Sequence, residues 1–154
     1  MENYTQKLKK YIKTNNIACE LLEFTTSCHS VEDAAKTVNA TAEDFVKNVC
    51  AITTENQFIV CVIKGENKLD FKKVKIVLNT KEVRMATPEE VLKNTGYPIG
   101  GVPSFGYAKM IYIDQNVMKK ELVYSGGGSD KVLVKISSKE ILRITQGKIA
   151  EIVR

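Results

Sequence analysis

The sequence contains no apolar run long enough to cross a membrane, no closely spaced cysteine pair and only one histidine. A helix that spans a bilayer needs roughly 20 consecutive apolar residues, and no run approaches that length. Residues 1–13 include several lysines but no apolar core of a secretory signal. We therefore expect a cytoplasmic protein that has no membrane association.

Cysteine spacing excludes the common zinc motifs. The four cysteines form no C-x-x-C pair and have no zinc-like spacing with His29. These cysteines are Cys19, Cys28, Cys50 and Cys61. We expect reduced, buried thiols, because disulfides are rare in the cytosol. We expect neither a metal nor another cofactor.

Several catalytic signatures are missing as well. The sequence has no P-loop and no dinucleotide-binding fingerprint, which argues against ATP and NAD as ligands. It shows no Ser-His-Asp or Cys-His order and no suggestive pair of carboxylates. An enzyme with this sequence would therefore work without a nucleophile of its own.

What the sequence does have is the composition of an ordinary globular domain. Its 154 residues are 44% hydrophobic and 27% charged, which is enough to bury a sizeable core. No repeat or low-complexity linker divides the chain, so we expect one domain over residues 1–154. The net charge of +5 permits a polyanionic partner but does not identify one, because the lysines are spread along the chain.

Hydrophobic periodicity and capping residues predict short helices that alternate with strands. The expected helices cover residues 4–14, 30–38, 70–78, 87–96 and 138–145, and the expected strands cover 18–24, 49–53, 58–63, 83–86, 109–114, 121–127, 131–137 and 148–154. Ser30, Asp70 and Thr87 are expected as N-caps, and Gly96 as the end of its helix. Hairpins mixed with helices indicate a mixed α/β fold with a mixed sheet, not a doubly wound parallel one.

The clearest hairpin covers residues 49–63, where two apolar runs flank a polar turn. Both runs are apolar on both faces, which predicts central strands that are covered on two sides. A two-residue turn at Glu55 and Asn56 would place Cys50 opposite Cys61.

Two glycine-rich stretches stand at the ends of expected strands: "IGGVPSFG" at 99–106 and "SGGG" at 125–128. Glycine clusters at such places are usually turns. They can also let a ligand approach the main chain, where successive N–H groups form an anion or oxyanion site. The residues alone leave both interpretations open.

Lys47 enters a strand that we expect to be buried, so it needs a partner or an open cleft, whereas His29 is interpreted as a helix-flanking residue.

Four segments occur in an order and at a spacing that are typical of a known family. They are "EDFVKNVCAI" at 43–52, "KNTGYPIGGVPSFGY" at 93–107, "IYID" at 111–114 and "VYSGGG" at 123–128. Together they resemble the YbaK/prolyl-tRNA synthetase insertion-domain family of editing domains. The resemblance implies a mixed α/β fold around a strongly curved, mostly antiparallel mixed sheet flanked by helices. It also implies hydrolysis of amino acids that are wrongly esterified to tRNA.

The resemblance implies site residues too. Lys47 matches the family's functional lysine, and Gly100 and Gly101 match the start of its substrate loop, so these three form the expected catalytic set. The expected substrate-binding residues are His29, Ser30, Val102, Pro103, Ser104, Phe105, Gly106, Asp114, Ser125, Gly126 and Gly127. Many relatives read "GGVSPFG" or "GGVPPFG" in the loop. Pro103 matches the second form, whereas Ser104 departs from both, and the amino-acid preference does not carry over.

The implied function is that of a free-standing aminoacyl-tRNA deacylase acting in trans on the acceptor end, with an aminoacyl-tRNA synthetase as a further expected partner. An aminoacyl ester is activated, so its hydrolysis mainly needs positioning, a water and stabilisation of the oxyanion. We expect loop N–H groups to stabilise the oxyanion and a cationic Lys47 to orient the substrate. A hydroxyl of the terminal ribose or an ordered water chain would act as the base.

Two other functions stay open at this stage. A non-catalytic module would bind an aminoacyl-tRNA end or a small aminoacyl-like ligand without turnover. A general nucleic-acid binder would show steep salt dependence and indifference to aminoacylation, although no strip of basic and aromatic residues supports it. The acyl group is also open, and alanine, proline-like and cysteine-like groups are all compatible with the sequence.

Overall fold

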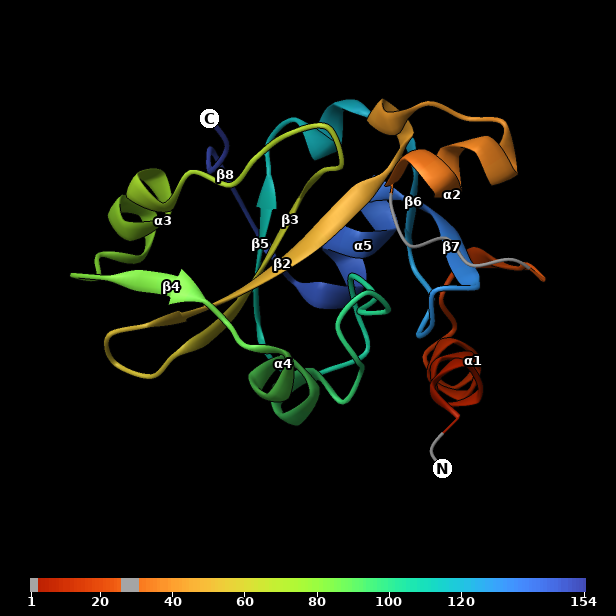
Figure 1. Ribbon diagram of the computed structural model, residues 1–154, viewed down its shortest axis with the longest axis horizontal. Helices are drawn as coiled ribbons and strands as arrows, with labels where there is room; N and C mark the ends of the chain where they lie inside the picture. Colours follow the sequence, from red (N-terminus) through yellow and green to blue (C-terminus); the bar gives the residue numbers. More distant parts are fainter. Residues whose placement is uncertain (1–2, 26–30) are drawn as a thin grey trace.

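The computed structural model describes residues 3–25 and 31–154 as a mixed α/β structure with two sheets (Figure 1). The helices are α1 (Tyr4–Thr14), α2 (Val31–Val38), α3 (Phe71–Leu78), α4 (Pro88–Thr95) and α5 (Ser138–Thr145), with the short turns η1 (Ala42–Asp44) and η2 (Val117–Lys119). The strands are β1 (Cys19–Glu23), β2 (Val46–Thr53), β3 (Phe58–Lys64), β4 (Val83–Met85), β5 (Met110–Asp114), β6 (Leu122–Gly126), β7 (Val132–Ser137) and β8 (Lys148–Ala150). The expected mixed α/β fold is confirmed, while the strong curvature of its sheet stays a prediction.

β3 occupies the centre of the five-stranded sheet, whose order is β4-β2-β3-β5-β8. It pairs antiparallel with β2 and parallel with β5, and β8 continues the sheet in parallel. Its residues from Phe58 to Ile63 are all buried, because apolar side chains leave both faces of the strand and each face meets its own core. The predicted double cover is therefore confirmed for β3.

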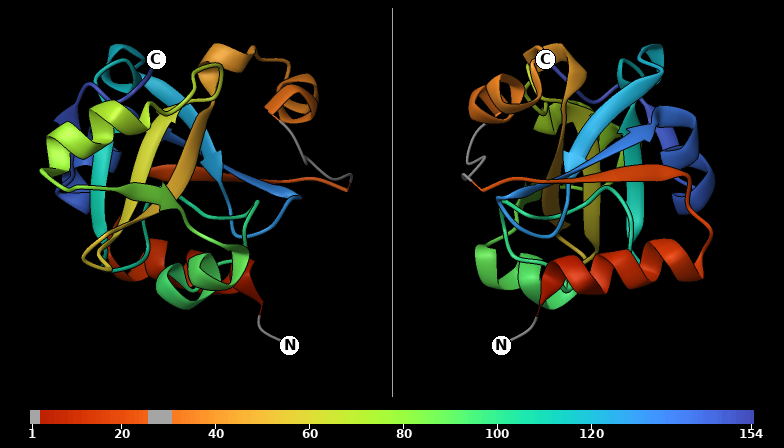
Figure 2. Two further views of the ribbon diagram at one scale, coloured as in Figure 1. Left: turned by 60° about the vertical axis from the view of Figure 1, so that its left-hand side comes forward. Right: turned by 90° about the vertical axis from the view of Figure 1, so that its right-hand side faces the viewer.

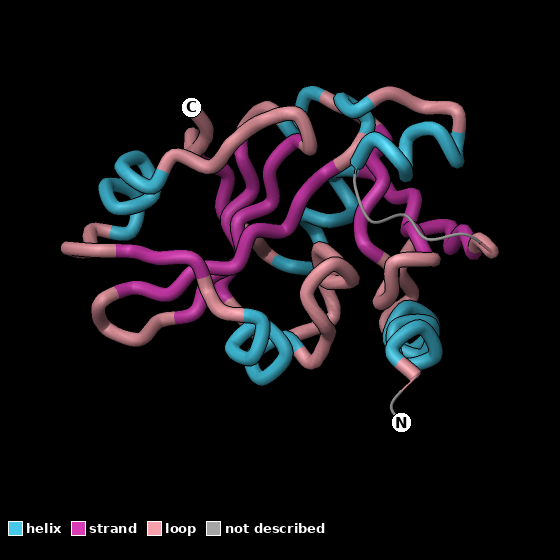
Figure 3. Tube along the Cα trace, viewed as in Figure 1, coloured by secondary structure: helices cyan, strands magenta, loops and turns pink. Residues whose placement is uncertain are grey.

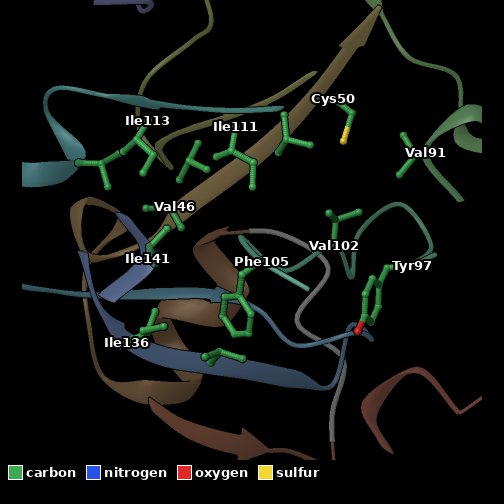
Figure 4. Packing of buried hydrophobic residues seen from close by; sticks show 14 of the residues in the cluster. Val46, Cys50, Val91, Tyr97, Val102, Phe105, Ile111, Ile113, Ile136 and Ile141 are labelled. Atoms are coloured by element: carbon green, nitrogen blue, oxygen red, sulfur yellow. The ribbon is translucent and has the colours of Figure 1, made fainter. Parts of the chain in front are cut away.

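The three-stranded sheet has the order β1-β7-β6 and is antiparallel throughout. Both views in Figure 2 show β1 running across the direction of β2, β3 and β5. A bridge between Phe45 and Tyr124 links the two sheets. Apolar side chains from both sheets, such as Ile111 and Ile136, form one core (Figure 4). β6 therefore lies beside the start of β2.

Capping residues set the ends of α3 and α4 as the sequence predicts. The Asp70 carboxylate accepts a hydrogen bond from the Lys72 N–H at 2.9 Å. Thr87 and Glu90 form a capping box at the start of α4, and Gly96 ends that helix with φ at +80°. Among the described residues no helix is long and apolar enough to cross a membrane.

The turn between β2 and β3 differs from the prediction. Val49, and not Cys50, pairs with Cys61, because the turn contains three residues, 54–56, and Asn56 has φ at +62°. A positive φ at the last loop residue is typical of a three-residue hairpin loop. The shift by one residue sends Cys50 and Cys61 to opposite faces, into separate cores. The prediction that these thiols face each other is wrong.

Candidate active site

A cleft of about 310 Å³ opens between the start of β2, the loop that follows α4 and the end of β6. Figure 3 shows this loop, residues 96–109, as a stretch without helix or strand. The cleft is lined by Ala34, Phe45, Val46, Lys47, Asn48, Val49, Cys50, Met85, Ala86, Val91, Ile99, Gly100, Val102, Ser125, Gly126 and Leu133. Five residues that the sequence predicts for the site are among them: Lys47, Gly100, Val102, Ser125 and Gly126.

Lys47 is among the residues that line this cleft. Successive side chains of a strand leave opposite faces, so the Lys47 side chain leaves β2 on the face opposite to that of Asn48 and Cys50. It is half-buried and forms no ion pair with any residue in the described part of the chain. Burial lowers the pKa of the Lys47 ammonium, and repulsion by Lys68 lowers it further. Lys47 is thus a partly desolvated cation whose side chain starts on the face of β2 away from Asn48.

At the edge of β2 that faces the cleft, main-chain peptide groups are available to hydrogen-bond a ligand. The Ala86 N–H donates to the Cys50 carbonyl at 2.9 Å, so even-numbered residues of β2 turn their peptide groups away from β3. Pairing between β2 and β4 begins only at Ala51. Asn48 therefore turns its peptide N–H and C=O toward the cleft, beyond the reach of β4.

A buried hydrogen-bond network joins β2, the loop and β6. The Asn48 Nδ2–H donates to the Val102 carbonyl at 2.9 Å. The Ser104 hydroxyl donates to Asn48 Oδ1 at 2.7 Å and lies 2.9 Å from the Ser125 hydroxyl. The Ser104 N–H also donates to Ser125 Oγ, at 3.1 Å. Ser104 and Ser125 are only 0% and 1% exposed, so the network fixes the loop against both strands.

The glycines of the two stretches mainly let these loops pack together. The Gly128 N–H donates to the Gly101 carbonyl at 2.8 Å, and the Gly101 N–H donates to the Pro98 carbonyl at 3.0 Å. A Cβ at Gly101 would lie 2.7 Å from the Gly128 carbonyl carbon. Gly100 differs, because it has φ at +88° and open space around its Cβ position. Gly100 therefore lines the cleft, whereas the Gly101 N–H is already engaged.

Among the cleft residues that the sequence reasoning missed, two carry a polar or ionisable side chain, Asn48 and Cys50. Both share a face of β2 with Val46, and a polar residue between apolar ones on a buried face is a signal that could have identified Asn48. Figure 4 shows the Cys50 sulfur on the side of β2 where Val91 and Val102 lie. Burial raises the pKa of the Cys50 thiol to about 12, so this thiol stays protonated and is a poor nucleophile.

Several predicted site residues lie away from the cleft. Asp114 is fully buried, and its carboxylate accepts from the Ile152 N–H and the Asn116 N–H, each at 3.0 Å. It therefore holds the C-terminal segment at the end of β5. The others that do not line the cleft are Gly101, Pro103, Ser104, Phe105, Gly106 and Gly127. They support the loop from within the core or pack against other segments. His29 and Ser30 lie outside the described residues.

No group of three or more His, Cys, Asp or Glu side chains is placed to hold a metal ion within residues 3–25 and 31–154. The polar residues among those that line the cleft are Lys47, Asn48 and Ser125, and the strand and loop residues add main-chain groups. This set can bind an ester and stabilise negative charge that develops on its carbonyl oxygen.

Comparisons with known proteins identify relatives of this fold and site. A family model described as an aminoacyl-tRNA editing domain matches residues 25–144. The chain is 32% identical over 132 residues to the uncharacterized protein YwhH of Bacillus subtilis, with 84% of this chain and 83% of YwhH covered. It is 25% identical over 125 residues to the "Putative Cys-tRNA(Pro)/Cys-tRNA(Cys) deacylase EbsC" of Enterococcus faecalis, with 80% and 76% covered. A crystal structure of a "putative trans-editing enzyme for prolyl tRNA synthetase" matches with a TM-score of 0.92 and 25% identity, with 100% and 99% covered.

Proposed function

Because the chain belongs to the aminoacyl-tRNA editing domain family, we propose that it is a free-standing deacylase that hydrolyses the ester of a mischarged tRNA in trans. Residues 1–154 would form one editing domain that takes the acceptor end of the tRNA into the cleft, in the cytoplasm and as an accessory to an aminoacyl-tRNA synthetase. The names of the EbsC and trans-editing relatives support this activity.

The observation that carries the proposal is the shared cleft of Lys47, Asn48 and Gly100. At about 310 Å³ it has the size of a small ligand pocket. No carboxylate is among the described residues that line it, so an acyl group with a small, uncharged side chain fits better than a cationic one. Met85 and Ile99 are 54% and 58% exposed at this cleft, which suits contact with the apolar face of a terminal base.

The chemistry needs no protein nucleophile. Water attacks the acyl carbon, the bond from that carbon to the ribose oxygen breaks, and the leaving oxygen receives the proton that the water loses. A neighbouring ribose hydroxyl or a second water relays this proton. Main-chain N–H groups at Gly100 and Asn48, two residues that line the cleft, would stabilise the oxyanion. Lys47 would orient the acceptor end through its charge.

The test is a panel of mischarged tRNAs incubated with the wild-type protein and with Lys47→Ala. We expect loss of the ester from at least one tRNA, and a fall in kcat/KM of about 10- to 100-fold in the variant, the usual range for a lost charged hydrogen bond. Lys139→Ala, an exposed lysine on α5, is the matched control and should keep its activity.

The panel also separates the proposal from its rival. Hydrolysis no faster than the spontaneous rate with every tRNA contradicts the deacylase. Tight binding of a stable aminoacyl-adenosine analogue without turnover would instead identify a binding module.

A further inference from the structure

We propose that the Asn48 side chain is a catalytic hydrogen-bond donor to the substrate's acyl carbonyl and that Ser104 is the residue that positions it. This inference rests on the proposed deacylase activity and adds to it a second kind of donor besides the main chain. It comes from the order of the hydrogen bonds that join Asn48, Ser104 and Ser125.

The chemistry of the neighbours fixes which way the Asn48 amide points. The Val102 carbonyl can only accept, so the side-chain atom that lies 2.9 Å from it is the Nδ2 amine. The Oδ1 atom must then face Ser104, whose hydroxyl donates to it at 2.7 Å. This assignment follows from donors and acceptors alone, and it does not depend on how an amide is drawn.

Ser125 is the third member of this hydrogen-bond network. Its oxygen accepts from the Ser104 N–H at 3.1 Å, and its own hydrogen is left for Ser104 Oγ at 2.9 Å. The direction of this last contact follows from Asn48, because Ser104 has one hydroxyl hydrogen and donates it to Oδ1. Each of these hydrogen bonds has one donor and one acceptor, so the Asn48 side-chain amide cannot flip while both serines are present.

One donor remains after these bonds are counted. The Nδ2 amine carries two hydrogens, and only the bond to the Val102 carbonyl engages it among the described residues. Asn48 lines the cleft and is partly exposed. The second Nδ2–H is therefore available to a ligand in the cleft, near the main-chain N–H groups.

A neutral donor at this place stabilises the oxyanion without giving up its proton. During hydrolysis the carbonyl electrons move to the oxygen when water attacks, and they return when the ester bond breaks. Asn48 holds that oxygen in between, and the proton of the attacking water goes to the ribose oxygen as described above. Loss of one such preorganised donor lowers kcat by about 100- to 1,000-fold in characterised enzymes.

The test measures kcat and KM for the mischarged tRNA that the wild-type protein hydrolyses best, using Asn48→Asp, Ser104→Ala and Ser104→Thr. Asn48→Asp keeps the acceptor for Ser104 but has no Nδ2–H, so we expect kcat to fall by about 100-fold with KM nearly unchanged. Ser104→Ala releases the amide and should lower kcat by about 10-fold, the equivalent of about 1.4 kcal/mol. Ser104→Thr keeps the hydroxyl and should restore kcat.

The matched control is Asn15→Asp. Asn15 also donates its Nδ2–H to a backbone carbonyl, that of Tyr11 at 2.9 Å, but it lies at the exposed end of α1. This variant should retain wild-type kcat. Thermal unfolding of every variant separates loss of the donor from loss of the fold.

The outcomes divide cleanly. Wild-type kcat in folded Asn48→Asp or in folded Ser104→Ala overturns the inference while leaving the deacylase intact. Should Asn48→Asp fail to fold, the comparison of Ser104→Ala with Ser104→Thr decides alone, because equal kcat values in these two variants contradict a positioning role. A wild-type protein that hydrolyses no tRNA removes the proposed function, and this inference with it.

Discussion

Gly101→Ala is the substitution that best tests how the two glycine stretches build the cleft. The added methyl would lie 2.7 Å and 2.8 Å from the carbonyl carbon and oxygen of Gly128, and 2.9 Å from the Ser129 nitrogen. These neighbours are backbone atoms, which cannot move aside as the end of a flexible side chain can. The two loops must therefore separate, and the hydrogen bond from the Gly128 N–H to the Gly101 carbonyl weakens.

The size of the effect follows from these contacts. Overpacking a tight site costs about 1–3 kcal/mol, and a lost backbone hydrogen bond adds about 1 kcal/mol. We expect the free energy of unfolding to fall by about 2–4 kcal/mol, which lowers Tm by about 5–15 °C in a chain of this length. Gly100→Ala should cost less, about 1–2 kcal/mol, because its methyl enters open space and only the positive φ is strained.

Urea unfolding followed by far-ultraviolet circular dichroism gives the free energies of wild type and both variants. Equal midpoints for Gly101→Ala and wild type would show that the loops do not pack as described. Activity should fall in Gly101→Ala even though Gly101 does not line the cleft, since Gly100 and Val102 lie on either side of it. A loss of activity in Gly101→Ala would therefore be caused by movement of the cleft wall, and not by lost contact between Gly101 and a ligand.

Two further predictions concern carboxylates outside the cleft. Asp114→Asn places an amine against one of two backbone N–H groups, those of Ile152 and Asn116. We therefore expect the free energy of unfolding in urea to fall by about 1–3 kcal/mol, while the folded variant keeps its deacylase activity. A variant that loses activity but keeps wild-type stability would contradict this. The Arg84 guanidinium holds the pKa of Glu90 at about 2, below its usual value of 4.5. The folded pKa is depressed, so this contribution to stability is present above about pH 4.5 and is lost as the pH falls toward 2. Tm measured against pH should show a shallower fall over that window in Glu90→Gln, and superimposable curves would count against the pairing.

The sequence predicts the local elements of this fold well, because their signals lie within a few residues. As expected, Asp70 and Thr87 cap the starts of α3 and α4, and Gly96 ends α4, since caps act through neighbouring backbone groups. The hairpin register failed for a local reason too: Asn56 adopts a positive φ and adds a residue to the turn. One extra loop residue was enough to move Cys50 to the other face.

The site is harder to predict, because it depends on contacts between segments that are far apart in the chain. The glycine pattern located the loop, yet it could not show that Gly101 packs on Gly128 or that Gly100 meets open space. Asp114 is the last residue of the buried strand β5 and looks like a ligand-binding carboxylate, but its partner Ile152 is 38 residues away. Asn48 gains its importance only from Ser104, which is 56 residues away.

The hydrogen-bond chain from Ser125 to Asn48 consists of hydroxyls, an amide and main-chain groups, none of which gains or loses a proton near neutral pH. Among the described residues that line the cleft, only Lys47 and Cys50 titrate, and the Cys50 thiol has a pKa of about 12. The donor pattern of the pocket is thus the same in mildly acidic and mildly alkaline solution. Within the part of the chain that the structure describes, the ammonium at position 47 is the cleft group through which acidity would act, besides the substrate itself.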